Sequence, residues 1–502
     1  MIFERFEGWC RRAAGRLAGR RPISGALLIA CLWVNQGLPS RDYQVLRQVV
    51  LEDRAAHPFL WMYQSVAHLY GRSGDEELYY STLAAIAGRV PYGSPINHHR
   101  GAIVPEAFRR QAPPADGKWH MPYRDVAMEY PVMALPFIAL PFFLSNSFLG
   151  FSLLFGALMG LCLWLSTRTL LRDESKEDYT FGFLTFIALL LAHGGLAVQR
   201  LDAAPALFVA IATWAAIRKR PVALGVALGA AVASKFLPAL LLGPLLMVLP
   251  ELRKPKALVA LGSSLALAVV VGLGPMELLH RGSIASVLGF HGHRGLQIES
   301  TGALIQSVVQ VLIGEPANHA VHSFGSFNYD GVAADTIAWF CGPLTVLATL
   351  MWMLMLLRQK PPATESDRRD RIIVAVLGGL TIQWLFSKVF SPQYLTWGIP
   401  LVAALTASRW RRLRGLFIAT LLMTQYFFRY AYDDLIQQQP SSIAMVCIRQ
   451  ALLVLMLYEL AQRLAPDRAL ALAASHEPSG ADMVNPVHAI AEHRSGEAGG
   501  IG

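Results

Sequence analysis

The sequence predicts an all-α polytopic membrane protein, and two observations predict it. Of the 502 residues, 54% are hydrophobic and only 16% are charged, whereas soluble globular domains carry about 25% charged residues. The missing charge coincides with continuous apolar runs long enough to cross a hydrocarbon core of about 30 Å. A transmembrane β-barrel would instead alternate apolar and polar residues over segments of about ten residues.

The N-terminal segment, residues 1–22, is predicted to be basic and cytoplasmic, and a first span follows at 23–38. The motif Leu28-Ile-Ala-Cys31 resembles a lipoprotein cleavage box. The apolar run continues past the cysteine and a many-span chain follows, which favours an uncleaved span over a signal peptide. The five cysteines are scattered without a C-x-x-C motif, so no disulfide framework is predicted.

About twelve transmembrane helices are predicted along the chain. Their ranges are 23–38, 150–168, 180–198, 203–217, 221–234, 236–250, 257–275, 334–357, 371–387, 392–408, 414–430 and 441–463. The short pair 221–234 and 236–250 is interpreted as a hairpin with Lys235 near its outer tip. The tail, 464–502, loses apolar periodicity and is predicted to be disordered and cytoplasmic.

Loop charge predicts the orientation. Basic residues gather in alternate loops: Arg168, Arg172 and Lys176; Arg218 to Arg220; Arg253, Lys254 and Lys256; Arg358, Lys360, Arg368, Arg369 and Arg371; Arg409, Arg411, Arg412 and Arg414. The opposite short loops hold little more than Arg200, Lys235, Lys388 and Arg429. Because basic loops stay in the cytoplasm, both termini are predicted to be cytoplasmic. These loops also explain the net charge of +10 better than nucleic-acid binding does.

Two long outer loops result from this orientation, 39–149 and 276–333. Residues 59–70 form an amphipathic stretch that predicts a surface-lying helix. Residues 131–148 could be a span, but Pro131, Pro136 and Pro141 break a regular helix. Counting this segment as a span would also place the Arg168 and Arg218 loops outside. We therefore interpret it as a juxtamembrane segment against the outer leaflet.

Several polar residues lie at the predicted outer ends of spans. Asp75 and Glu76 come where a loop turns into a helix, so a helix cap with an acidic first turn is the simple interpretation. Arg200 and Asp202 open the span at 203–217, where they could equally form a structural pair. Lys235 follows an apolar run, and a lysine in mid-membrane costs about 2.5–3.5 kcal/mol. It should therefore lie at an interface or be paired, and binding of an anionic headgroup is the functional alternative.

Two further outer segments are rich in hydrogen-bonding groups. One loop holds His291, His293, Arg294, Gln297 and Glu299. The two histidines suggest a zinc site, but the sequence has no further cluster of zinc ligands, so a solvated loop is favoured. The other segment holds Lys388, Gln393 and Tyr394 between two spans. Pro392 naturally starts the following helix there. An amide- and aromatic-rich turn would also suit a sugar.

Ordered sequence words carry a family resemblance. They are Asp75 with Leu78-Tyr-Tyr, Gly88-Arg-Val-Pro-Tyr92, Tyr123-Arg-Asp-Val-Ala-Met-Glu-Tyr-Pro131, Arg200-Leu-Asp202, Lys235-Phe-Leu-Pro238, Arg294-Gly-Leu-Gln-Ile-Glu-Ser300 and Phe390-Ser-Pro-Gln-Tyr-Leu-Thr-Trp397. Over residues 20 to 460 the chain resembles bacterial polyprenyl-phosphate-mannose-dependent mannosyltransferases of the GT-C glycosyltransferase fold. Each word alone is weak, and the ordered set is more specific for the family than for the sugar.

The resemblance implies a GT-C-like domain over 23–463 in the bacterial inner membrane, with its active face periplasmic. It implies that an acidic residue of the first outer loop acts on the acceptor hydroxyl, and Asp75 matches that position with Glu76 beside it. Asp202 matches a second acidic position. The chain departs from the family pattern because 39–74 and 94–120 are inserted around these words. Asp125 and Glu129 are therefore alternative bases.

The mechanism that we expect is transfer of a single sugar, mannose by resemblance, from a polyprenyl phosphate to a periplasmic acceptor hydroxyl on a glycolipid or glycan, with inversion. The residues expected to bind the substrates are Arg200, Lys235, His291, Arg294, Gln297, Glu299, Lys388, Gln393, Tyr394 and Glu129. Lys235, Arg294 and Lys388 would hold the leaving lipid phosphate, since Lys acts as a point charge and Arg as a bidentate donor. No cofactor and no divalent metal are expected.

Two other function classes are compatible with a cationic outer groove. A flippase or transporter for a lipid-linked sugar needs access from both faces, so polar residues should also line the inner half of the spans. Within spans, however, few such residues occur, among them Gln383, Gln425 and Arg449, and the last could form an interhelical contact. A non-catalytic membrane scaffold would not predict an acid and several cations on one side.

Overall fold

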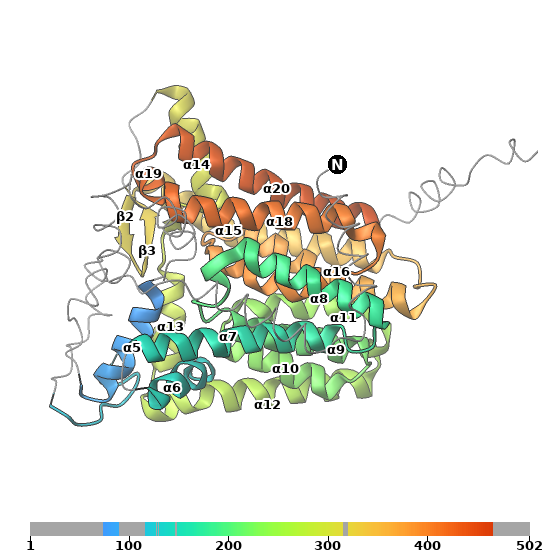
Figure 1. Ribbon diagram of the computed structural model, residues 1–502, viewed down its shortest axis with the longest axis horizontal. Helices are drawn as coiled ribbons and strands as arrows, with labels where there is room; N and C mark the ends of the chain where they lie inside the picture. The colour runs from blue at the N-terminus through green and yellow to red at the C-terminus, as the bar shows by residue number, and fades with distance from the viewer. Residues whose placement is uncertain are drawn as a thin grey trace, which may run out of the picture.

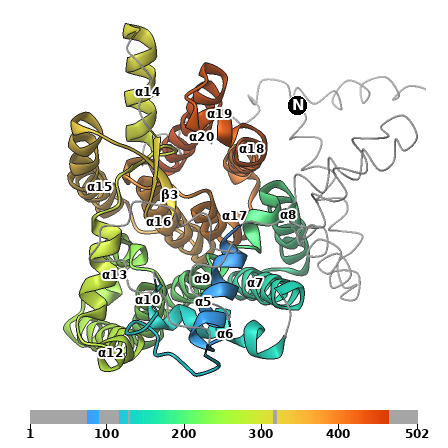
Figure 2. The same cartoon turned by 90° about the vertical axis from the view of Figure 1, so that its left-hand side faces the viewer.

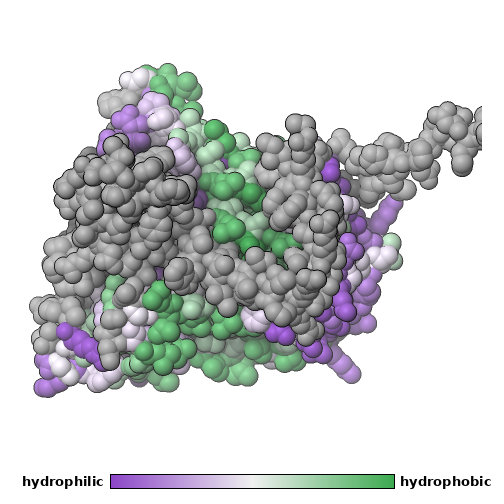
Figure 3. Space-filling model, in the orientation of Figure 1, coloured by the Kyte–Doolittle hydropathy of each residue, from purple (hydrophilic) through white to green (hydrophobic). Residues whose placement is uncertain are grey.

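The computed structural model of the chain describes residues 74–89, 116–126, 128, 130–145, 148–314 and 320–464. The predicted span at 23–38, the helix at 59–70, Glu129 and the tail after 464 lie outside the described residues. Figure 1 shows a bundle in which most helices run along the long axis of the molecule, and Figure 3 shows apolar residues gathered over the middle of this face with hydrophilic residues toward its ends.

Helices cover the predicted spans after residue 74. Along the bundle the chain forms α7 (Phe148–Leu170), α8 (Lys176–His193) with η4 (Gly194–Ala197), α9 (Ala203–Ile217), α10 (Pro221–Ser234), η5 (Leu237–Leu241) with α11 (Leu242–Val248), η6 (Pro250–Arg253), α12 (Pro255–Leu279), α15 (Val332–Leu357), α16 (Glu365–Phe386), η7 (Pro392–Trp397) with α17 (Gly398–Ala404), η8 (Ser408–Trp410), α18 (Arg411–Tyr426) and α20 (Pro440–Leu464). By length and composition, five of the described helices could cross a membrane: Gly150–Leu170, Lys176–Ala197, Pro255–Leu279, Val332–Leu357 and Pro440–Leu464. The chain is thus a multi-pass α-helical membrane protein, and the total of twelve spans stays a prediction.

Alternate turns meet at one end of the bundle, as the loop-charge pattern requires. Arg368 of α16 donates to the carbonyl of Ile217 at the end of α9 (2.7 Å) and pairs with Glu251. Arg369 donates to the carbonyl of Ala404 at the end of α17 (2.8 Å) and pairs with Glu174 (3.0 Å). Helix C-termini present unpaired carbonyls and a negative dipole end, so buried guanidinium groups satisfy both. We call this set of contacts the inner network.

The opposite end carries shorter elements, seen face-on in Figure 2. They are α5 (Gly74–Ile86), η3 (Val132–Ala134), α6 (Leu135–Leu144), α13 (Ser283–Gly292), β1 (Leu296–Gln297), α14 (Thr301–Ile313), β2 (Ala320–Ser323), β3 (Ser326–Tyr329) and α19 (Tyr432–Ile436). Both cartoon views show α14 projecting away from the bundle. The segment 131–148 forms η3 and the ten-residue α6, a helical stretch that is too short to span, with Pro141 inside α6.

The predicted outer loop 276–333 contains the helices α13 and α14 and three short strands. Its strands form a three-stranded antiparallel sheet in the order β1-β3-β2. The β2–β3 turn is made by Phe324 and Gly325, whose φ angles of 51° and 72° are both positive, as a two-residue hairpin turn requires. His291, predicted to lie in a solvated loop, belongs to α13.

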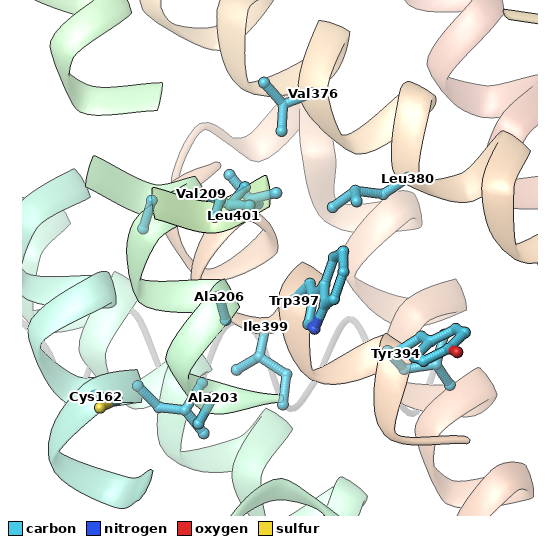
Figure 4. Close-up of a cluster of buried hydrophobic side chains, with 14 of the residues drawn as sticks. Cys162, Ala203, Ala206, Val209, Val376, Leu380, Tyr394, Trp397, Ile399 and Leu401 are labelled. Atoms are coloured by element: carbon cyan, nitrogen blue, oxygen red, sulfur yellow. The ribbon is translucent and has the colours of Figure 1, made fainter. Parts of the chain in front are cut away.

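A continuous apolar core joins α7, α8, α9, α16 and α17. In Figure 4, Ala203, Ala206 and Val209 of α9 face Ile399 and Leu401 of α17. Small residues let helix backbones approach closely, which is how membrane helices gain packing energy where the hydrophobic effect does not drive association. The run of alanines in α9 thereby places its N-terminal turn against η7, where the candidate site lies.

The contact between α15 and α16 gives a stability prediction. A Cβ added at Gly378 would overlap the indole ring of Trp352, and that indole already donates to the Ala375 carbonyl (3.1 Å). Gly378→Ala should therefore destabilise the protein by about 1–3 kcal/mol through overpacking. Gly342→Ala, where nothing lies within 4 Å, is the matched control and should be neutral or slightly stabilising. Unfolding followed by circular dichroism in detergent compares the two; equal midpoints would contradict the prediction.

Candidate active site

The first turn of α5 brings Asp75 to the turn that precedes α9. Arg200 in that turn forms an ion pair with the Asp75 carboxylate, and its guanidinium lies 5.7 Å from the Phe428 ring centroid. The Tyr79 hydroxyl, one turn further along α5, lies 3.3 Å from that of Tyr130. The sequence placed Asp75 and Arg200 on the same side of the bilayer, and the structure brings their side chains into contact.

Asp202 forms a second buried cluster beside the first. Its Oδ1 accepts from Lys235 Nζ (2.7 Å) and from the indole Nε1 of Trp397 (2.9 Å). Lys235 ends α10 in extended backbone, and its ammonium lies 4.4 Å from the Tyr394 ring centroid, a cation–π distance. Asp202 also attracts Arg200 electrostatically. Lys235 is therefore paired with a carboxylate. This pairing offsets the free-energy cost of placing an ammonium group next to an apolar run.

The three candidate carboxylates, Asp75, Glu76 and Asp202, differ in their exposure to solvent. The Asp75 side chain is 23% exposed, whereas that of Asp202 is 2% exposed and Glu76 is fully buried. Glu76 accepts a hydrogen bond from the Ser152 hydroxyl of α7 (2.7 Å). A general base must reach the proton it removes. Among these three carboxylates, Asp75 offers the most surface to a substrate, and the other two anchor the elements around it.

A cationic cluster lies near the sheet and is formed by Arg294 and Lys388. Arg294 donates to the Ser326 hydroxyl (2.9 Å), and Lys388 Nζ donates to the Gly292 carbonyl (2.6 Å). The Lys388 carbonyl in turn accepts from the backbone of Gln297 (3.0 Å), which ties β1 to the α16–η7 turn. In these contacts both cations bond neutral groups, and Asp335 attracts Lys388 electrostatically. At the end of the bundle that holds the candidate site, this cluster is the place best suited to bind an anion.

Lys388 gives a pH prediction. Burial, and then the positive charge of Arg294, lower the pKa of Lys388. Its charge is thus lost at lower pH than that of an ordinary lysine, while a phosphodiester keeps its charge. The KM for an anionic donor should therefore rise on the alkaline side. Lys388→Arg should flatten that rise because Arg stays protonated. Initial rates at several pH values test this, and the same KM profile in both proteins would remove Lys388 from donor binding.

Glu299 is held by a residue from a distant helix. Arg449 of α20 donates to its Oε2 (2.8 Å) and to its backbone carbonyl (2.7 Å), and both side chains are 1% exposed. The sequence suggested an interhelical contact for Arg449, whereas these hydrogen bonds go to the turn between β1 and α14. Glu299 was predicted to bind substrate; its burial favours a positioning role for the segment between β1 and α14.

The remaining predicted site residues are placed as follows. Gln297, Gln393 and Tyr394 are buried, His291 is half-buried with its ring near Phe236, and His293 is exposed. Asp125, an alternative base, accepts from Arg124 and from the Met121 backbone in its own turn. In the part of the chain that the structure describes, no group of three or more His, Cys, Asp or Glu could hold a metal ion.

Sequence reasoning missed the neutral partners in the site: Ser152 at Glu76, Trp397 at Asp202 and Ser326 at Arg294. Trp397 stood in a quoted sequence word, but nothing in the sequence showed which atom its indole would reach. Ser152 and Ser326 are single hydroxyls in unremarkable surroundings, so no local signal could have singled them out.

A comparison with known families bears on this arrangement. Residues 130–387, about half of the chain, match the family described as glycosyltransferase family 87. The chain belongs to glycosyltransferase family 87. No curated protein matches it. The matched region contains Arg200, Asp202, Lys235, Arg294 and Glu299, whereas Asp75 and Lys388 lie outside it.

Membership of glycosyltransferase family 87 makes the protein a membrane glycosyltransferase. An enzyme that transfers a sugar needs a group to accept the acceptor proton and positive groups near the leaving group. The family 87 chain has both kinds of group at one end of its helix bundle. This favours catalysis over the flippase and scaffold alternatives.

Proposed function

We propose that this family 87 enzyme has a GT-C-type fold and transfers one sugar, mannose, from a polyprenyl phosphate to an acceptor hydroxyl at the extracytoplasmic membrane surface. The observation that carries the proposal is the arrangement at one end of the bundle. A part-exposed carboxylate, Asp75, lies there with the buried Asp202–Lys235 pair, while the basic turns meet at the opposite end. By the positive-inside rule the Asp75 end faces away from the cytoplasm.

In the proposed reaction the acceptor oxygen attacks the anomeric carbon from the face opposite the phosphate. The new C–O bond forms as the bond between the anomeric carbon and the phosphate oxygen breaks, so the configuration inverts. Asp75 takes the hydroxyl proton, and the lipid phosphate leaves with the electron pair. Arg200 beside Asp75 favours the ionised carboxylate, which is the form a base needs.

The leaving phosphate gains negative charge and needs cations that are already in place. Arg294 and Lys388 fit this role best because the hydrogen bonds described for them go to neutral groups, Ser326 and the Gly292 carbonyl, whereas Lys235 is balanced by Asp202. Tyr394 lies beside Lys235, and Gln393 precedes it in the chain. These two residues would serve the sugar, since a sugar ring packs on an aromatic ring and an amide bonds its hydroxyls. No resident cofactor enters this scheme.

The direct test is transfer in a purified system. The protein in lipid nanodiscs is incubated with polyprenyl phosphates carrying labelled mannose, other hexoses or pentoses, together with a membrane lipid extract. The expected result is a labelled glycolipid whose new linkage has the configuration opposite to the donor. Retention of configuration, or transfer only from nucleotide sugars, would overturn the proposal. Movement of donor across the bilayer without a product would favour the flippase.

A further inference from the structure

The end of α18 changes its winding beside the candidate base. After Tyr426 the chain makes a π-helical turn over Phe427–Ala431 (η9) before α19 begins. Such turns cost regular hydrogen bonding and are frequent at functional sites, because they redirect side chains. Here three consecutive residues, Phe427, Phe428 and Arg429, face the charged groups of the site.

The contacts of this π-turn are specific. Phe427 lies 5.7 Å from the Arg449 guanidinium, and Phe428 lies 5.7 Å from that of Arg200. The Arg429 guanidinium lies 5.9 Å from the same Phe428 ring and donates to Gln199 Oε1 at 3.5 Å. Arg200 and Arg429 therefore share one aromatic ring, and Arg429 holds the residue next to Arg200 in the chain.

Arg429 also contributes to the site through its charge. Glu76 is fully buried, and Arg429 is a cation that it attracts electrostatically. A buried carboxylate without a nearby cation is costly, and it would also repel the Asp75 carboxylate next to it in sequence. The attraction by Arg429 thus offsets the charge of Glu76, while the Ser152 hydrogen bond to Glu76 holds α5 against α7.

We propose that Arg429 is a positioning residue for sugar transfer: from the π-turn it fixes the Gln199–Arg200 turn and balances buried Glu76, so that Asp75 faces the acceptor. The inference rests on the proposed role of Asp75 and adds to it a residue of the π-helical turn η9. Arg429 touches neither reacting atom in this scheme.

The kinetic test compares Arg429→Gln, Arg429→Lys and the double variant Arg429→Gln with Glu76→Gln. Arg429→Gln should lower kcat about 10- to 100-fold with little change in donor KM, as expected for a misplaced catalytic group. Arg429→Lys should recover part of kcat, and so should the double variant, because it removes the unbalanced buried charge. Arg412→Gln, near the other end of α18 with a 63% exposed side chain, is the control and should keep wild-type rates. A wild-type kcat in Arg429→Gln, or no recovery in either rescue variant, would overturn the proposal.

A second readout needs no turnover and separates this proposal from the proposed function. Asp75→Cys is made with Arg429 intact and with Arg429→Gln, and each thiol is labelled with an anionic and with a neutral methanethiosulfonate reagent. The ratio of anionic to neutral labelling rates should fall severalfold when Arg429 is lost, because its charge acts at position 75. An unchanged ratio would overturn the positioning role even if sugar transfer is shown. A changed ratio with no transfer from any polyprenyl donor would refute the proposed function alone.

Discussion

Asp75→Asn should lower the turnover number by about 10²–10⁴-fold while the protein still folds and binds its donor. The amide has nearly the shape of the carboxylate but cannot accept the hydroxyl proton. Arg200 would lose its ionic partner but keep Phe428 and the attraction of Asp202. The loss should therefore appear in kcat, and donor KM should change much less. Initial rates at saturating acceptor, with the protein's melting temperature measured alongside, check the prediction.

The matched control for Asp75→Asn is Asp330→Asn. Asp330 is exposed and bonds the adjacent Gly331 backbone (2.9 Å), so its amide variant should keep full activity. Asp125→Asn tests one of the alternative bases, Asp125 and Glu129. It should keep activity, because Asp125 is hydrogen-bonded within its own turn. Near-normal transfer by Asp75→Asn and Asp75→Ala would exclude Asp75 as the base. A collapse of kcat in Asp125→Asn instead would move the assignment there.

Arg449→Met should destabilise the protein by about 3–5 kcal/mol, which is the usual cost of leaving one member of a buried ion pair unpaired. The Arg449 guanidinium serves both the carboxylate and the backbone carbonyl of Glu299, and packs 4.3 Å from the Phe390 ring centroid. Removing the guanidinium leaves the Glu299 carboxylate without its cation, in a position that water cannot reach. Denaturant titration in mild detergent, with tryptophan fluorescence as the signal, measures the loss.

Two further variants serve as controls for the Arg449 prediction. Arg412→Met removes an exposed partner 3.6 Å from Glu459 and should cost less than about 1 kcal/mol. The double variant Arg449→Met with Glu299→Leu should regain much of the lost stability, since apolar replacement of both members is often neutral. Equal stability of Arg449→Met and Arg412→Met would show that the pair contributes little. A double variant as unstable as the single one would attribute the loss to packing.

Much of the helical layout could be predicted because lipid imposes it. Apolar runs must form helices to satisfy their backbone, and the alternation of basic loops then determines which turns lie together. The prediction that the Arg218 and Arg368 loops share an end is met by the contacts of Arg368 with the end of α9. The β2–β3 hairpin was not predicted, because its only signal is a single glycine after Phe324 and its strands have four residues each.

The candidate site was predictable in its charges but not in its pairings. Asp202 and Lys235 were both singled out, yet only folding shows that they bond each other, since 33 residues and the α9–α10 turn separate them. Glu299 and Arg449 are 150 residues apart, and no local pattern links them. A sequence shows that a buried charge needs a partner, whereas the choice among several available cations depends on the tertiary arrangement. Arg429 was noted only as a loop charge for the same reason.

The inner network has a consequence for how substrates arrive. Guanidinium groups of α16 tether the ends of α9 and α17, and Arg409 adds a bond from the α17–α18 turn to Asp370 (2.7 Å). Helices that are tethered at one end tilt about that end, so the displacement of a helix increases with distance from the tether. Tilting motions of the helices would thus be greatest at the end that holds Asp75, opposite the inner network. A long lipid tail could then slip sideways between helices without opening a path for ions through the membrane.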